Sequence, residues 1–226
     1  MFRRATKSEL EDFVSVGTAV SRTSEGHHVG LLFREDGEIR FLHFAFHHDL
    51  RCDNHIDEKY VWAGCPIVEQ GGEILIDPFI AYLNAVKENK SIPYSLMSDP
   101  ECFMNSGEFI DLGSPFGLTC STFIAALFQS YGLKVVNLDT WEPRPDDVEV
   151  QLRLVGALDD RRIKTGSPDQ KFVDAVRDCV GAPRLRPCEI ASAVASDVPP
   201  LDFDAARLLA EEIIKCLSES EKATES

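Results

Sequence analysis

Two apolar, β-prone runs separated by an Asp-Gly turn constrain the fold of this chain more than any other feature. The runs are residues 29–33 and 39–46, and the turn is Asp36-Gly37. An Asp-Gly pair between such runs is typical of a β-hairpin, because glycine readily adopts the positive φ angles of a tight turn. Another strand is expected at residues 60–63. The sequence therefore predicts a small antiparallel sheet in the first third of the chain.

Residues 117–132 carry the clearest helical pattern. Phe123, Leu127 and Tyr131 recur at helical spacing, and Gly132 is a natural end for the helix. Thr119 is the expected N-cap, because a threonine hydroxyl can accept a hydrogen bond from a backbone N–H of the first turn. This assignment places Cys120 in the first turn of the helix.

The rest of the chain is predicted from weaker signals. Residues 10–20 fit a short helix or a strand, residues 89–117 look irregular, and residues 135–138 are short and β-like. Residues 142–149 form a polar break, and residues 152–158 fit either a strand or a helix. Further helices are predicted at residues 74–88, with Asp77-Pro78 at the start, and at residues 170–180 and 205–217.

These patterns predict an α+β protein of 226 residues with two parts. Residues 1–150 would form a domain in which an antiparallel sheet packs on the helix that carries Cys120. Residues 151–226 would form a helical C-terminal extension.

Charge and cysteine content restrict the partners and the compartment. The chain has 23 lysine and arginine residues against 38 acidic ones, a net charge of −15, which argues against a nucleic-acid partner. Its seven cysteines are an odd number without a C-x-x-C pair, as expected in a reducing compartment. No apolar run is long enough to span a membrane, so we expect a cytoplasmic protein without stable membrane insertion. The sequence gives no indication of oligomeric state.

Cys120 is the strongest candidate for a nucleophile. The free N–H groups and the dipole at a helix start stabilise a thiolate, and the N–H of Cys120 could also point at an oxyanion. Thr119 and Ser121 flank it and are candidates for substrate contact. The alternative for Cys120 is a small buried core residue, which is where most free cysteines are found.

A base for this thiol is expected among six histidines that all lie within residues 27–55. His28 opens the first strand of the hairpin and His43 lies in the second, so one imidazole could act as the base and the other could orient it. Period-two alternation alone does not decide between His27 and His28. For His43 the alternative is a core histidine satisfied by the backbone.

The segments His28 to Leu32, Phe41 to Phe44 and Thr119 to Phe123 together resemble a known superfamily. Their order is similar to that of circularly permuted papain-like thiol hydrolases, which include NlpC-type peptidases and lecithin-retinol-acyltransferase-like enzymes. Ile92 to Ser95 also resembles the Pro-Tyr element that precedes the cysteine helix in bacterial members. The resemblance covers residues 25–140.

This resemblance implies a fold, a reaction and a set of site residues. It implies a permuted papain-like fold and hydrolysis of an amide in a peptide-like substrate through a thioester. Cys120 would be the nucleophile, His28 rather than His27 the base, and His43 the residue that fixes its tautomer. Tyr94 would line the substrate cleft. Neither a cofactor nor a metal is expected.

Three alternatives accompany this reading. The same chemistry could serve a lipid acyltransferase or phospholipase, although no apolar or basic membrane anchor is evident. The chain could instead be a binding module without catalytic activity. It could also bind zinc through the neighbouring soft ligands His47, His48, Cys52 and His55, although zinc sites usually contain a second, distant pair. Acidic residues in the same segment, including Asp49 and Asp53, indicate a solvated loop.

Overall fold

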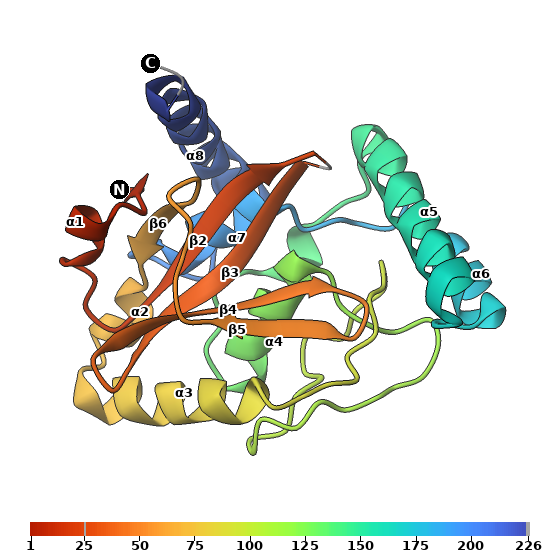
Figure 1. Ribbon diagram of the computed structural model, residues 1–226, viewed down its shortest axis with the longest axis horizontal. Coiled ribbons are helices and arrows are strands. Elements are labelled where there is room, and N and C mark those ends of the chain that lie inside the picture. Colours follow the sequence, from red (N-terminus) through yellow and green to blue (C-terminus); the bar gives the residue numbers. More distant parts are fainter. Residues whose placement is uncertain (25, 225–226) are drawn as a thin grey trace.

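The computed structural model describes residues 1–24 and 26–224 and has an α+β fold, in which helices cover a six-stranded antiparallel sheet (Figure 1). The strands lie in the order β1-β6-β2-β3-β4-β5. Their bounds are β1 Arg3–Arg4, β2 Val16–Thr23, β3 Gly26–Glu35, β4 Glu38–Phe46, β5 Asp49–Asp53 and β6 Val61–Gly64. The α+β class predicted from the sequence is confirmed.

The predicted hairpin is β3 and β4. Its turn is formed by Asp36 and Gly37, whose φ angles are 50° and 84°. The strand expected at residues 60–63 is β6, which pairs with β1 and β2 rather than with the hairpin. β2 occupies part of the segment that fitted either a helix or a strand.

β3 and β4 pair only near their turn. Their ladder runs from Glu35 and Glu38 to Leu31 and Leu42. Beyond that point β4 pairs only with β5, which lies on its other edge, while β3 continues its pairing with β2 down to Gly26. The far ends of the hairpin therefore separate (Figure 1). The expectation of a solvated loop is wrong for residues 49–53, because their backbone completes the sheet edge beside β4.

The two sides of the sheet carry different layers. Val29, Leu31 and Phe33 of β3 belong to the main core, which also contains residues of the helix α4 (Cys120–Ser130). Leu32 and Phe41 belong to a smaller cluster on the opposite face. Since side chains alternate along a strand, His28 and Gly30 share the face of Leu32, whereas His27 shares the face of Val29.

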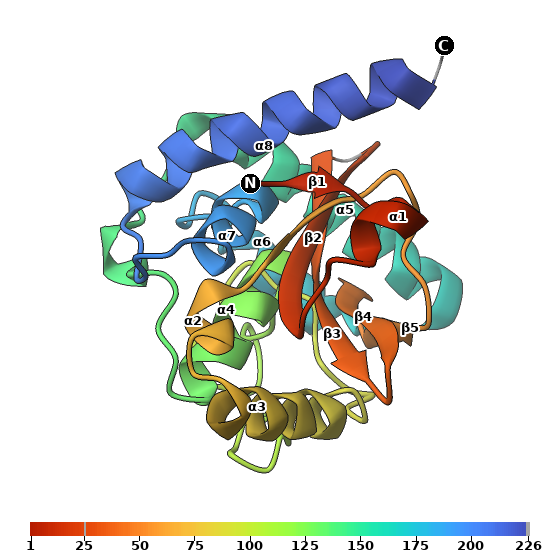
Figure 2. The same cartoon turned by 90° about the vertical axis from the view of Figure 1, so that its left-hand side faces the viewer.

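Eight α-helices complete the described part of the chain, and their arrangement is visible in two views (Figures 1 and 2). α4 packs on β3 and β4, while α7 packs on β2, β3, α4 and α8. Figure 2 shows α8 running along one side of the molecule and α3 along the opposite side. The remaining bounds are α1 Lys7–Leu10, α2 Pro66–Glu69, α3 Glu73–Val86, α5 Val148–Thr165, α6 Gln170–Arg177, α7 Pro187–Val194 and α8 Phe203–Thr224.

Several helix predictions need correction. α3 begins at Glu73, after Gly72 with a φ angle of 60°, so Pro78 lies inside the helix and not at its start. Residues 152–158 belong to the long helix α5. The buried helix α7 was not predicted. Residues 135–138 contribute only an isolated bridge between Val136 and Leu201, followed by a short 3-10 helix at Leu138–Thr140.

Residues of the C-terminal part contribute to the same core as the sheet. Ile190 and Val194 of α7 are fully buried in the main cluster, together with Ala206 and Ile213 of α8. Val155 and Leu158 of α5 belong to this cluster as well. No helix within residues 1–24 and 26–224 combines the length and the apolar character that crossing a membrane requires.

Candidate active site

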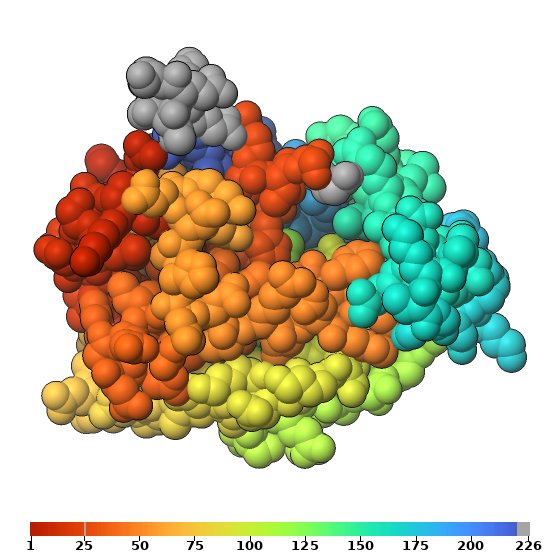
Figure 3. Space-filling view, viewed as in Figure 1, coloured from red at the N-terminus to blue at the C-terminus, as the bar shows by residue number. Residues whose placement is uncertain are grey.

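A cavity of about 460 Å³ lies where the hairpin strands separate, and the predicted site residues line it. Its lining includes His27, His28, His43 and Cys120, so side chains from both faces of the sheet reach one space. Figure 3 shows the surface hollowed between the end of the β2–β3 pair and α5. The separation of β3 from β4 is therefore the structural reason why a site can form here.

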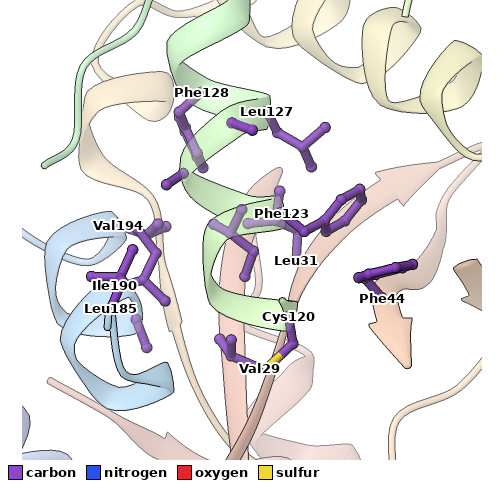
Figure 4. Packing of buried hydrophobic residues seen from close by; sticks show 14 of the residues in the cluster. Val29, Leu31, Phe44, Cys120, Phe123, Leu127, Phe128, Leu185, Ile190 and Val194 are labelled. Atoms are coloured by element: carbon purple, nitrogen blue, oxygen red, sulfur yellow. The ribbon is translucent and has the colours of Figure 1, made fainter. Parts of the chain in front are cut away.

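Cys120 is the first residue of α4, as predicted. Thr119 is the N-cap, and its hydroxyl accepts a hydrogen bond from the N–H of Thr122, while the hydroxyl of Thr122 accepts one from the N–H of Thr119. This capping box fixes the helix start. Figure 4 shows the sulfur of Cys120 turned toward β3 beside Val29. The thiol thus faces the strand that carries His28.

Burial dominates the ionisation of the Cys120 thiol. It raises the pKa of Cys120, although the backbone N–H of Val29, the hydroxyl of Ser121 and the charge of Arg184 all act to lower it. The side chain is 9% exposed. At neutral pH the resting thiol is therefore protonated, because a buried thiolate is poorly solvated.

His28, His43 and Asp53 form a chain of polar contacts. His28 Nε2 lies 2.8 Å from His43 Nδ1, and His43 Nε2 lies 3.1 Å from Asp53 Oδ2. The carboxylate of Asp53 can only accept, so His43 donates from Nε2 and accepts through Nδ1 from the Nε2–H of His28. In this tautomer Nδ1 of His28 carries the lone pair that a thiol proton needs.

The imidazole of His28 is uncharged at neutral pH. Burial lowers the pKa of His28 to about 4, with further lowering by the nearby His43 and by the charges of Arg51 and Lys59. Burial also lowers the pKa of His43, against the bond to Asp53, which acts to raise it. The thiol of Cys120 and the imidazole of His28, which line the same cavity, are therefore both neutral at neutral pH.

Gly30 makes room for this arrangement. A Cβ atom at Gly30 would lie 2.6 Å from the ring of Phe41 and 2.7 Å from Cβ of His43. The rings of Phe41 and His43 are stacked, with centroids 4.7 Å apart. Only glycine at position 30 therefore lets His43 lie against β3 and reach His28.

The three predicted substrate-contact residues, Tyr94, Thr119 and Ser121, all line the cavity. Tyr94 stacks on Phe44 and lies against Phe46, and burial raises its pKa. Its backbone N–H donates to Nδ1 of His47 over 3.2 Å. Residues 89–117 contain only isolated bridges, as predicted, yet Tyr94 is held firmly beside the thiol.

His27 also lines the cavity, from the face of the sheet that α4 covers. The hydrogen bond to His43 over 2.8 Å is made by Nε2 of His28. The structure thus assigns the pair expected from the sequence to His28 and His43, and it places His27 as their neighbour in the same cavity.

Sequence reasoning missed several residues of this site. Asp53 was assigned to a loop, and the alternation of residues 49–53 was the available signal for a strand. No local pattern in the sequence places Arg51, Arg184 or α5 at this site, because their positions depend on contacts between distant parts of the chain. From α5 the cavity receives Val150, Leu154 and Ala157, and the segment that leads into α7 supplies Arg184, Leu185 and Pro187.

The zinc alternative finds no support in the described residues. Within residues 1–24 and 26–224, no three His, Cys, Asp or Glu side chains gather as a metal site would require. The ring of His47 instead stacks on His48, with centroids 3.9 Å apart, and Cys52 lies in β5.

Comparison of the chain with family models, with curated proteins and with solved structures found no match. The chemistry of the site must therefore be argued from its own geometry.

Proposed function

We propose that the protein is a cysteine hydrolase that cleaves an amide bond in a peptide-like substrate. The observation that carries this proposal is the chain from His28 through His43 to Asp53, whose two histidines line the same cavity as a thiol at a helix start. An oriented imidazole beside such a thiol is the constellation that nucleophilic catalysis requires.

In the first step Sγ of Cys120 attacks the substrate carbonyl carbon while Nδ1 of His28 takes the thiol proton. The neutral resting state means that proton transfer accompanies attack, as in general base catalysis. His43 holds the ring of His28 and, with Asp53 behind it, stabilises the imidazolium that forms. The C–S bond forms as the carbonyl π bond breaks, which gives a tetrahedral oxyanion.

The oxyanion would be held at the start of α4. The capping box uses the N–H groups of Thr119 and Thr122, whereas the N–H of Cys120 lies outside it. N–H groups in the first turn of a helix point away from the helix body and carry partial positive charge. The N–H of Cys120 is therefore the donor best placed to stabilise the oxyanion.

The second half of the reaction releases both products. The C–N bond breaks as the imidazolium of His28 gives its proton to the leaving amine, and a thioester on Cys120 remains. Water then attacks the thioester while His28 takes a proton from it. Collapse of this intermediate releases a carboxylic acid and returns the proton to the thiolate of Cys120.

The order of these elements also supports the resemblance to circularly permuted papain-like hydrolases. Both histidines precede the cysteine, they lie on two strands of one hairpin, and the cysteine begins a helix that packs on those strands. We propose the permuted papain-like fold on this basis.

Acylation by p-nitrophenyl acetate tests the proposal directly. The wild-type protein should release a burst of p-nitrophenolate, and peptide mapping should find the acetyl group on Cys120. In Cys120→Ser the rate of the burst should be at least about a hundredfold lower. Cys188→Ser is the matched control, because Cys188 is also a buried free thiol but does not line the cavity. Equal acetylation of Cys120 and Cys188 would exclude a catalytic role for Cys120.

A further inference from the structure

The charge of the cavity lining differs from that of the whole chain. The chain has 38 acidic residues and a net charge of −15. Among the described residues that line the cavity, none is acidic, whereas Arg51 and Arg184 are both present. A lining with two arginines and no carboxylate favours a negatively charged ligand over a positively charged one, provided that an arginine keeps N–H donors for the ligand.

Arg184 is held in place by hydrogen bonds to residues that do not line the cavity. Its Nη1 donates to Oδ1 of Asp147 over 2.9 Å, and its backbone carbonyl accepts a bond of 2.6 Å from Nη2 of Arg144. Asp147 is 1% exposed and also accepts bonds from Arg144 and Arg186. Arg184 is thus fixed in position before any ligand arrives, which lowers the entropic cost of binding.

The guanidinium of Arg184 has N–H donors that its bond to Asp147 does not use and that a ligand can accept from. A guanidinium has five N–H donors, and the bond to Asp147 uses one of them. Arg51 is different, because its Nε and Nη2 bond to both oxygens of Asp49, at 2.9 Å and 2.6 Å. Arg51 therefore has both carboxylate oxygens of Asp49, whereas Arg184 has a single bond to Asp147. Arg144 and Arg186, which also contact Asp147, each bond to a second carboxylate, that of Glu189 and that of Asp146.

The remainder of the wall beside Arg184 is apolar. Val150, Leu154 and Ala157 lie one helical turn apart along one side of α5, and Leu185 and Pro187 continue the same wall. A substrate can thus place an anionic group at Arg184 and an apolar part along α5.

We propose that Arg184 is a specificity residue that binds an anionic group, carboxylate or phosphate, close to the bond that Cys120 attacks. This inference rests on the proposed function for its catalytic readout. The positive charge of Arg184 also acts to lower the pKa of the Cys120 thiol. Arg184 belongs to the C-terminal part of the chain, so that part completes the substrate cavity.

Three p-nitrophenyl esters of similar length test this inference. They are the mono-p-nitrophenyl ester of glutaric acid, p-nitrophenyl methyl glutarate, and p-nitrophenyl 4-phosphonobutanoate. The rate measured with Cys120→Ala, which lacks the thiol, gives the spontaneous hydrolysis and is subtracted from each rate. We expect kcat/KM to be at least about tenfold higher for an anionic ester than for the neutral one, mainly through KM. The carboxylate and phosphonate esters show which anion is preferred.

Variants at three positions assign the effect. Arg184→Gln should remove the preference for anionic esters, so that kcat/KM for the anionic esters falls to the value of the neutral ester in the same variant, and Arg184→Lys should keep part of the preference. Arg186→Gln is the control, because Arg186 also contacts Asp147 but does not line the cavity, and it should keep the preference. Equal kcat/KM for anionic and neutral esters in the wild type would overturn the inference and leave the hydrolase proposal intact.

A binding measurement separates the two proposals if no ester acylates Cys120. Calorimetry of the Cys120→Ala variant should then show tighter binding of monomethyl glutarate than of dimethyl glutarate, and the difference should vanish when Arg184→Gln is added. This result would support anion binding by Arg184 although the hydrolase proposal had failed. No difference between the two ligands would overturn the inference.

Discussion

The two ends of the β3–β4 hairpin differ in what their residues do. At the turn end the strands pair from Glu35 and Glu38 to Leu31 and Leu42, and the side chain of Phe33 is fully buried. At the far end β4 no longer pairs with β3 and keeps only its pairing with β5 on its other edge, and His28 and His43 line the cavity of Cys120. The paired end of the hairpin thus packs into the core, whereas the end where β3 and β4 no longer pair lines the cavity of the candidate site.

The largest expected effect is on stability and lies at the paired end. Phe33→Ala removes a fully buried ring from the main core, and we expect the free energy of unfolding to fall by about 3–5 kcal/mol. Urea denaturation measures this change. The acylation rate of Cys120 per folded molecule should change little, so a large loss of that rate would show that the two ends are coupled.

The next effect lies where pairing ends. Gly30→Ala places a methyl group against Phe41 and Cβ of His43, so His43 must shift away from His28. We expect the acylation rate to fall about a hundredfold, which corresponds to about 2.7 kcal/mol. Gly156→Ala is the matched control, because a Cβ there meets no atom within 4 Å. Normal activity of Gly30→Ala would contradict the assigned position of His43.

A third effect concerns pH and the segment between β4 and β5. Burial lowers the pKa of His47 to about 4, and the Nδ1 atom of His47 accepts the N–H of Tyr94, so folding requires its neutral form. The unfolded chain binds the proton near pH 6.5, so this stability is present above pH 6.5 and is lost as the pH falls toward 4. We expect His47 to contribute about 2 kcal/mol to the loss of stability between pH 7 and pH 5, and the buried His28, whose pKa is also lowered to about 4, to add a loss of its own.

His47→Asn checks this origin, because the amide oxygen of asparagine can accept the same N–H without titrating. Chemical denaturation at pH 5 and pH 7 should show a smaller difference for His47→Asn than for the wild type. The same pH dependence in both proteins would show that other groups cause it.

The smallest effect lies at the end of the polar chain. The side chain of Asp53 is 46% exposed, so its contact with His43 is partly screened by water. Asp53→Asn should lower the acylation rate about fivefold to tenfold, which is below the effect of moving His43. Asp57→Asn is the control, because Asp57 pairs with Lys59 and does not contact His43. A loss in Asp57→Asn of equal size would point to a general effect of charge.

Local patterns predicted the hairpin and the start of the Cys120 helix, because an Asp-Gly turn and a Thr119 cap act over a few residues. The point at which β4 stops pairing with β3, and the position of Asp53, could not be predicted in this way. The position of Asp53 depends on the pairing of β4 with β5, a segment whose acidic residues resemble a solvated loop. Arg184 depends on contacts with Arg144 and Asp147 about forty residues earlier in the chain, and no local pattern signals them.

The choice between the two neighbouring histidines shows the same limit. Alternation alone does not decide between them, although in the structure it puts His27 on the face of α4 and His28 on the opposite face. Where β3 and β4 no longer pair, both histidines reach the cavity, and His28 contacts His43. The position of the strand break therefore decides the chemistry, and the sequence does not show where that break lies.

The role of His28 as the base is tested most directly by comparing the acylation rate of Cys120 in His28→Asn and His27→Asn. We predict a loss of about a thousandfold in His28→Asn, because the general base is removed, and a loss of less than about tenfold in His27→Asn. Both variants should keep the wild-type free energy of unfolding at pH 7 to within about 1 kcal/mol. A thousandfold loss in His27→Asn, with His28→Asn close to the wild type, would contradict the account.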